Sequence, residues 1–245
     1  MPQPYFGTIS NGMTNSAVLT KLPDQNQART MKRIFLVDDH PMLREGLSRL
    51  IAQMPGCTVC GEAESASAGM EAILLAAPDL VMTDVSLPGK NGLELIKDLQ
   101  IQTPTTPILV FSMHDEMLYA ERVMRAGAKG YLMKSVPVET LTHAIMQVLS
   151  GGVYLSNRVS EHILQNLCGS RTPGKAGIKS LTDRELEIFE LIGAGKSSTQ
   201  IADELHISPK TTDAHRANIR AKLGLPDGPA LMREAVLWVE LGTEV

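Results

Sequence analysis

Between residue 31 and about residue 149, short apolar runs alternate with stretches whose apolar residues recur every three or four positions. The short runs predict strands near 32–37, 58–62, 80–83, 107–111 and 129–132. The longer stretches predict helices over 41–53, 65–77, 92–101, 116–126 and 137–149. Strict alternation of the two favours right-handed crossovers and a parallel sheet covered by helices on both faces. The pattern therefore predicts a flavodoxin-like, doubly wound α/β domain with a five-stranded parallel sheet over residues 31–150.

After Gly151 and Gly152 the pattern becomes purely helical. A possible helix over 157–167 lies inside a linker, 151–179, whose end is rich in glycine and also contains proline and lysine. Four helices are then expected, over 182–193, 197–205, 209–223 and 228–241. The sequence thus predicts a small all-α domain over 180–245.

The first thirty residues are polar and have no periodicity, so we expect a disordered leader over 1–30. The whole chain has 245 residues, 43% of them hydrophobic and 20% charged, as expected for two globular domains. No apolar run approaches the roughly 18 residues of a membrane helix. We therefore expect a cytoplasmic protein without a membrane partner.

Polar residues follow four of the predicted strands. These are Asp38 with Asp39, Asp84, Ser112 and Lys134. Each could separately cap a helix or occupy a turn. The carboxyl ends of parallel strands, however, gather in one crevice, and crowded carboxylates are compatible with a divalent cation such as Mg²⁺. One carboxylate could then attack a phosphoryl group while the lysine neutralises its oxygens, so the set predicts a phosphorylation switch.

Two other motifs are weaker indications of function. Cys57 and Cys60 form a CxxC pattern, but positions three apart on a strand point to opposite faces, so the thiols are not expected to meet. Residues 195–197 resemble the end of a phosphate-binding loop. Glu190 occupies its first glycine position, however, and a helix rather than a strand precedes it.

The first domain resembles the receiver domain of bacterial response regulators. The resemblance rests on residues 36–47 (LVDDHPMLREGL), 84–92 (DVSLPGKNG) and 126–134 (AGAKGYLMK). It implies that Asp84 accepts a phosphoryl group and that Lys134 pairs with the phosphoryl oxygens. The implied Mg²⁺ ligands are the carboxylates of Asp38, Asp39 and Asp84 and the backbone carbonyl of Ser86. Ser112 would turn towards the phosphoryl group, and Tyr131 would follow it from an exposed to a buried position.

The second domain has the helix lengths of a helix-turn-helix, with the turn at 206–208 and the motif over about 196–215. Residues 178–245 are acidic, with 8 Lys/Arg against 11 Asp/Glu. The helix over 209–223 instead has four basic residues against Asp213 alone. Concentration of basic charge on one helix favours double-stranded DNA, because phosphate contacts need Lys and Arg only at the interface.

This domain resembles the LuxR/NarL/FixJ DNA-binding domain. The matching positions are 181–185, 195–198, 201–202, 205, 207–208, 210–211, 215, 219 and 222–224. Thr212 replaces the usual valine, and Asp213 stands where many members have lysine. An acidic side chain accepts a hydrogen bond from cytosine N4 but repels phosphate. The predicted DNA contacts lie on one helix: Lys210, Thr211, Asp213, Ala214, Arg216, Ala217, Arg220 and Lys222.

Both halves together resemble a two-component response regulator of the NarL/FixJ class, which is not an enzyme in its own right. The resemblance implies a sensor histidine kinase that phosphorylates Asp84. Twofold DNA sites favour a homodimer, helped by residues 228–241 around Trp238.

Three alternatives stay open. One is a regulator of the same build that does not use phosphate, and another is an interaction adaptor without DNA binding. The third is a haloacid dehalogenase type of hydrolase. That chemistry needs a second aspartate where this chain has Ser86.

Overall fold

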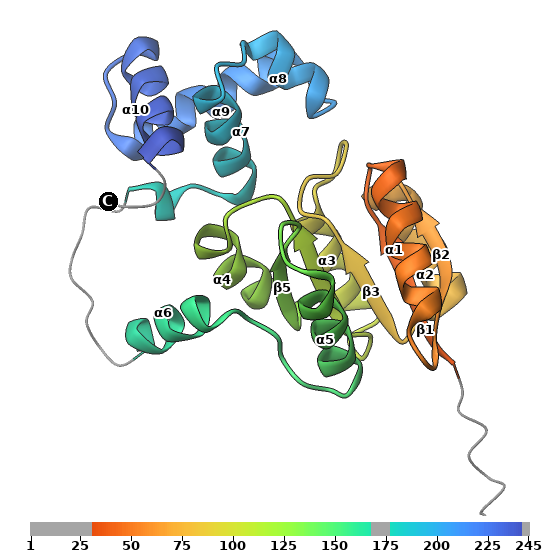
Figure 1. Cartoon of the computed structure of the whole chain (residues 1–245). Helices are drawn as coiled ribbons and strands as arrows, with labels where there is room; N and C mark the ends of the chain where they lie inside the picture. Colours follow the sequence, from red (N-terminus) through yellow and green to blue (C-terminus); the bar gives the residue numbers. More distant parts are fainter. Residues whose placement is uncertain (1–30, 168–176, 242–245) are drawn as a thin grey trace, which may run out of the picture. The chain divides into compact units, whose positions relative to one another are not determined.

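The structure is a computed structural model that describes residues 31–167 and 177–241 (Figure 1). The predicted leader and residues 168–176 of the predicted linker lie outside the described residues. The described chain consists of an α/β part followed by helices alone. None of the described helices is both long enough and apolar enough to cross a membrane.

A five-stranded parallel sheet forms the centre of the α/β part. Its strands are β1 (Lys32–Val37), β2 (Cys57–Ala63), β3 (Leu80–Thr83), β4 (Ile108–Ser112) and β5 (Gly130–Met133). They pair in parallel in the order β2-β1-β3-β4-β5. This order confirms the predicted flavodoxin-like fold, in which ligands bind beyond the carboxyl ends of the strands. The predicted strand ends differ from the observed ones by one residue at β2, β4 and β5.

Helices cover both faces of the sheet, as Figure 1 shows. They are α1 (Pro41–Gln53), α2 (Ala66–Ala76), α3 (Gly92–Gln102), α4 (Glu116–Ala126) and α5 (Val138–Leu149). On β1, Ile34 packs with residues of α1 and α5, whereas its neighbour Phe35 packs in the cluster that contains residues of α2, α3 and α4. Successive strand side chains point to opposite faces, so both faces are buried. This explains why β3 and β4 and the second half of β1 are continuous apolar runs rather than alternating ones, whereas the edge strand β2 is only partly buried.

The two cysteines of the CxxC motif lie on opposite faces of β2. Cys57 packs in the cluster that holds α1 and α5, and Cys60 packs against the other cluster. The pairing of β1 with β2 shifts between Ile34 and Phe35, which leaves Cys60 as the extra residue of a β-bulge. Both thiols are free, so the expectation that they do not meet is confirmed.

The helical part contains α6 (Asn157–Leu167), α7 (Asp183–Gly193), α8 (Ser198–Glu204), α9 (Pro209–Leu223) and α10 (Gly228–Leu241), with a short 3₁₀ turn over Ile178–Ser180. Serine and threonine side chains cap the first turns of α7, α8 and α9. Phe189 on α7 is fully buried and lies 5.5 Å, between ring centroids, from Trp238 on α10. Ile201, Ile219 and Leu231 contribute further fully buried side chains to this part.

Candidate functional site

The sheet brings the predicted acidic and basic residues to one edge. Asp84 follows β3, and its N–H donates to the Val37 carbonyl of the neighbouring strand at 3.0 Å. Lys134 follows β5 and donates in the same way to the Ser112 carbonyl at 2.7 Å. The backbone ladder thus continues one residue past the strands and aligns the side chains of the pocket.

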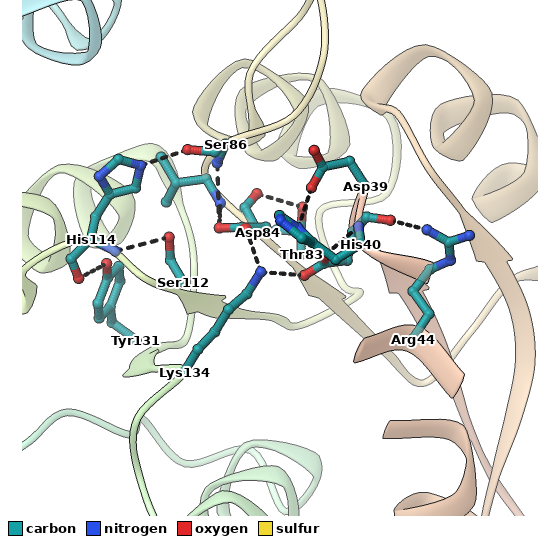
Figure 2. Close-up of polar contacts among 12 residues, drawn as sticks. Asp39, His40, Arg44, Thr83, Asp84, Ser86, Ser112, His114, Tyr131 and Lys134 are labelled. Carbon is teal, nitrogen blue, oxygen red and sulfur yellow. Dashed lines mark hydrogen bonds and ion pairs between the residues drawn. The ribbon is translucent and has the colours of Figure 1, made fainter. Parts of the chain in front are cut away.

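Lys134 lies between two carboxylates, and Figure 2 shows its ammonium group joined to Asp84. Its Nζ is 2.6 Å from Asp84 Oδ2 and 2.6 Å from Asp38 Oδ2. The side chains of Lys134, Asp38 and Asp84 are only 6%, 5% and 3% exposed. Burial lowers the pKa of the Lys134 amine, but the two carboxylates outweigh that effect, and the pKa is raised above its usual value. Lys134 is therefore a permanent cation within the pocket.

The other oxygen of Asp84 is held by the backbone. Asp84 Oδ1 accepts hydrogen bonds from the N–H of Val85 at 2.6 Å and of Ser86 at 3.3 Å. Gly92 passes so close that a Cβ built on it would lie 1.9 Å from the Asp84 carbonyl oxygen. Only glycine fits there, a constraint that the sequence pattern does not indicate.

The acidic groups form one cluster that extends to the pocket rim. Ligand atoms of Asp38, Asp39, His40 and Asp84 all lie within 4.8 Å of one another. Asp39 is the exposed carboxylate, 2.7 Å from His40 Nδ1. Carboxylate oxygens gathered in this way fit a hard divalent cation such as Mg²⁺. The contribution of the His40 ring to this rim was not foreseen from the sequence.

The predicted switch residues lie beside the pocket (Figure 2). Ser112 is fully buried, and its hydroxyl oxygen accepts from the His114 N–H at 3.4 Å. Tyr131 is also buried, and its hydroxyl donates to the His114 carbonyl at 2.8 Å. Burial, together with the charge of Asp84, raises the pKa of Tyr131 far above its usual value, so the phenol stays a donor. The structure shows the buried position of Tyr131, and the exposed position expected before phosphorylation stays a prediction.

Ser86 and His114 interact next to the phosphoacceptor candidate. Ser86 Oγ lies 2.6 Å from His114 Nε2. The two residues belong to the loops that follow β3 and β4. Their contact therefore joins the two loops that flank Asp84 and Ser112.

Helices α8 and α9 have the geometry of a helix-turn-helix. The turn between them contains His206, which has a positive φ of 53°. Ser208 caps α9 by accepting from the Thr211 N–H at 3.1 Å, and Pro209 occupies the first helical position. Thr212 is fully buried, and its hydroxyl donates to the Ser208 carbonyl at 3.5 Å. Threonine therefore fills the place of the usual valine without leaving its hydroxyl unpaired.

The predicted DNA contacts divide into two groups. Most side chains on α9 that were predicted to touch DNA are exposed, among them Lys210, Asp213, Ala214 and Ala217. Lys222 differs, because its ammonium forms an ion pair with the buried Glu185 of α7 at 2.5 Å. The Lys222 ammonium is therefore partly neutralised by a carboxylate of its own domain. Its role in DNA binding stays a prediction.

Comparisons with known proteins agree with this architecture. The response regulator receiver domain model matches residues 34–146, and the model of bacterial regulatory proteins of the luxR family matches residues 179–235. The nitrate/nitrite response regulator protein NarL of Escherichia coli K12 is 34% identical over 206 residues, covering 84% of this chain and 94% of NarL. The oxygen regulatory protein NreC of Staphylococcus aureus JH9 is 32% identical over 209 residues, 83% of this chain and 96% of NreC.

Solved structures show the same fold. A LuxR family two-component response regulator from Aurantimonas sp. SI85-9A1 is 36% identical, with a TM-score of 0.53 over 56% of this chain and 98% of that one. RcsB from Salmonella typhimurium, 24% identical, has a TM-score of 0.62 over 84% of this chain and 96% of its own.

A receiver domain joined to a LuxR-type DNA-binding domain defines a transcriptional response regulator. The chain belongs to the NarL/FixJ family of these regulators.

Proposed function

We propose that Asp84 is the phosphoacceptor of this regulator and that its phosphorylation controls DNA binding by α9. One observation carries the proposal: Lys134 Nζ lies 2.6 Å from both Asp84 and Asp38 in a buried pocket at the strand ends. A fixed cation beside a strand-end carboxylate provides the charge needed to stabilise a transferring phosphoryl group. The donor is a sensor histidine kinase, as for other two-component response regulators.

Phosphoryl transfer requires a nucleophile and a way to neutralise charge. A carboxylate oxygen of Asp84 forms the new bond to phosphorus as the bond from phosphorus to the donor atom breaks, and the donor leaves with that electron pair. Lys134 neutralises one side of the transferred group. Asp38, Asp39, Asp84 and the Ser86 carbonyl would hold Mg²⁺, which supplies positive charge at the phosphoryl oxygens.

Phosphorylation of Asp84 would then alter the hydrogen bonds of Ser112 and the position of Tyr131. A phosphoryl group on Asp84 offers new acceptor oxygens, and the Ser112 hydroxyl would turn to donate to one of them. Ser112 at present accepts from the His114 N–H, and Tyr131 donates to the His114 carbonyl. Movement of Ser112 therefore affects the loop after β4, which both residues contact.

The output is binding of double-stranded DNA by α9 in the major groove. Lys210, Thr211 and Arg216 would contact the backbone, and Arg220 would lie nearer the groove floor. A homodimer would match twofold DNA sites. Trp238 packs on Phe189 within the domain, so we expect the exposed neighbours of Trp238 on α10, rather than its ring, to form the dimer contact.

The test compares wild type with Asp84→Asn in DNA binding, each with and without Mg²⁺ and beryllofluoride, which mimics a phosphoryl group. We expect the mimic to change the DNA affinity of wild type and to leave that of Asp84→Asn unchanged. Asp98→Asn removes a receiver carboxylate outside the pocket and should respond as wild type does. Equal binding by wild type and Asp84→Asn in every condition would favour a regulator of this family that works without phosphate.

A further inference from the structure

One strip of α9 combines an acidic residue with small ones. Lys210, Asp213, Ala214 and Ala217 have spacings of three, four and seven residues from the first. On an α-helix these positions share a face, and all four side chains are exposed. The opposite face of α9 contains the fully buried Thr212 and Ile219. The strip is therefore the surface of the helix-turn-helix that is turned away from its own domain.

Asp213 is an uncompensated charge on this strip. Its carboxylate has no hydrogen bond or ion pair within residues 31–167 and 177–241. Two other carboxylates of the same part form ion pairs, Glu185 with Lys222 and Glu204 with Lys196, and Asp213 differs from them in lying on the exposed strip of α9. A carboxylate near DNA phosphates is repelled unless it accepts hydrogen bonds from a donor in the groove. Asp213 therefore requires a donor when α9 binds DNA.

The neighbours of Asp213 allow its short side chain to reach the base edges. Ala214 and Ala217 project only a methyl group each, so they let the helix backbone approach the groove floor closely. Aspartate has one methylene between its backbone and its carboxylate, which makes such an approach necessary for contact. Asp213 also lies in the N-terminal half of α9 (Pro209–Leu223), the half that contacts base edges in helix-turn-helix proteins.

We propose that Asp213 is a specificity-determining residue that selects cytosine by accepting a hydrogen bond from its N4 amino group. The major groove presents two amino donors, cytosine N4 and adenine N6. Adenine places the acceptor N7 beside its amino group, and this acceptor repels a carboxylate. Cytosine has no such acceptor, so it is the better partner. The inference rests on the proposed DNA binding by α9 and adds the base that this helix reads.

The test is selection of duplexes from a random DNA library by the full chain, followed by sequencing. Wild type is compared with Asp213→Ala, which removes the acceptor, and with Asp213→Asn, which can bond both N6 and N7 of adenine. Asp203→Asn is the matched control, because it removes one exposed carboxylate from the neighbouring helix α8. Affinity for a non-selected duplex is measured in parallel by fluorescence anisotropy, with circular dichroism to verify folding.

We expect wild type to select cytosine at one position of each half-site, by about tenfold over other bases. Asp213→Ala should lose that preference alone and bind non-selected DNA at least as tightly, because it no longer repels phosphate. Asp213→Asn should prefer adenine there, and Asp203→Asn should keep cytosine.

Unchanged base selection by a folded Asp213→Ala protein would overturn the assignment of Asp213 while leaving DNA binding intact. Failure of wild type to bind any duplex, with or without the phosphoryl mimic, would instead overturn the proposed function together with the assignment that rests on it.

Discussion

The receiver pocket and the exposed strip of α9 use charge in opposite ways. In the pocket, the Lys134 ammonium lies 2.6 Å from the carboxylates of both Asp38 and Asp84, and all three side chains are almost completely buried. On the strip, Lys210 and Asp213 are exposed and have no ion pair in the described part of the chain. The pocket charges thus contact one another, with an excess of carboxylates over ammonium groups, whereas the charges of the strip have no ion-pair partner among the described residues.

This difference predicts how the two regions respond to substitution. Removing one member of a buried ion pair leaves the other charge uncompensated. In the pocket this should lower both the free energy of unfolding and the rate of phosphorylation. Removing an exposed charge changes stability little, because surface charges are solvated and screened. We therefore expect pocket variants to alter folding and phosphorylation together, and strip variants to alter DNA binding alone.

The largest effect is expected from Lys134→Met. Loss of the ammonium removes the fixed positive charge beside Asp84, and the rate of phosphorylation should fall about 100-fold. Incorporation of label from radioactive acetyl phosphate in the presence of Mg²⁺ measures this rate. Lys129→Met is the control, because Lys129 is exposed at the opposite end of β5.

Stability provides a second measurement on the same variant. Without a divalent cation, two buried carboxylates lose their partner, and the free energy of unfolding should fall by about 3 kcal/mol. Added Mg²⁺ should stabilise Lys134→Met more than wild type, because the carboxylates no longer have a competing cation. Equal stabilisation of both proteins by Mg²⁺ would contradict the assignment of these carboxylates as its ligands.

A smaller effect on the pocket is expected from Gly92→Ala. The new Cβ would meet the Asp84 carbonyl at 1.9 Å, so the backbone must move, at a cost of about 1–3 kcal/mol. Thermal unfolding measures the cost, and the phosphorylation rate shows whether Asp84 has been displaced. Gly46→Ala is the matched control. Gly46 lies within α1 with no atom within 4 Å of its added Cβ, so alanine should stabilise the protein there.

The sequence predicted the receiver better than the surface of α9, for a physical reason. The strands β1, β3, β4 and β5 end in apolar, mostly buried runs because both sheet faces are covered, and Asp38, Asp84, Ser112 and Lys134 follow such runs directly. Parallel strands bring their ends together, so chain position alone implied that these side chains converge. The contacts of Lys134 with Asp38 and Asp84 are less predictable, because β3 and β4 separate β5 from β1 and the lysine side chain must extend across the strand ends.

The sequence did not predict which individual residues contact one another outside regular secondary structure. Lys222 was expected to bind DNA because it belongs to a basic helix, yet its ammonium pairs with Glu185 of α7. The approach of Gly92 to the Asp84 carbonyl is nearer in sequence, but it depends on the conformation of the loop between β3 and α3. Local periodicity contains no signal for either contact.

Lys222 allows the contrast between paired and unpaired charge to be tested on α9 itself. Lys222→Met leaves the buried Glu185 with only its capping contacts, and stability of the helical part should fall by about 1 kcal/mol, since Lys222 remains partly solvated. The single tryptophan, Trp238, packs on Phe189 and reports unfolding of this part by fluorescence. Lys210→Met should weaken DNA binding without changing this transition. A larger loss of stability in Lys210→Met than in Lys222→Met would reverse the contrast.

The smallest effect concerns the pH dependence of that same ion pair. Burial raises the pKa of Glu185, but hydrogen bonds from Lys222 and from Thr182 outweigh it, and the pKa is lowered. A carboxyl group with a lower pKa in the folded state contributes stability that is full above its unfolded pKa, about 4.3, and is lost as the pH falls through the folded value. Lys222→Met removes the strongest of these lowering contacts. The difference in unfolding free energy between wild type and Lys222→Met should therefore shrink as the pH is lowered from about 6 to about 3. Urea titrations followed by Trp238 fluorescence measure this difference, and a constant value across the range would show that the ion pair does not stabilise the fold.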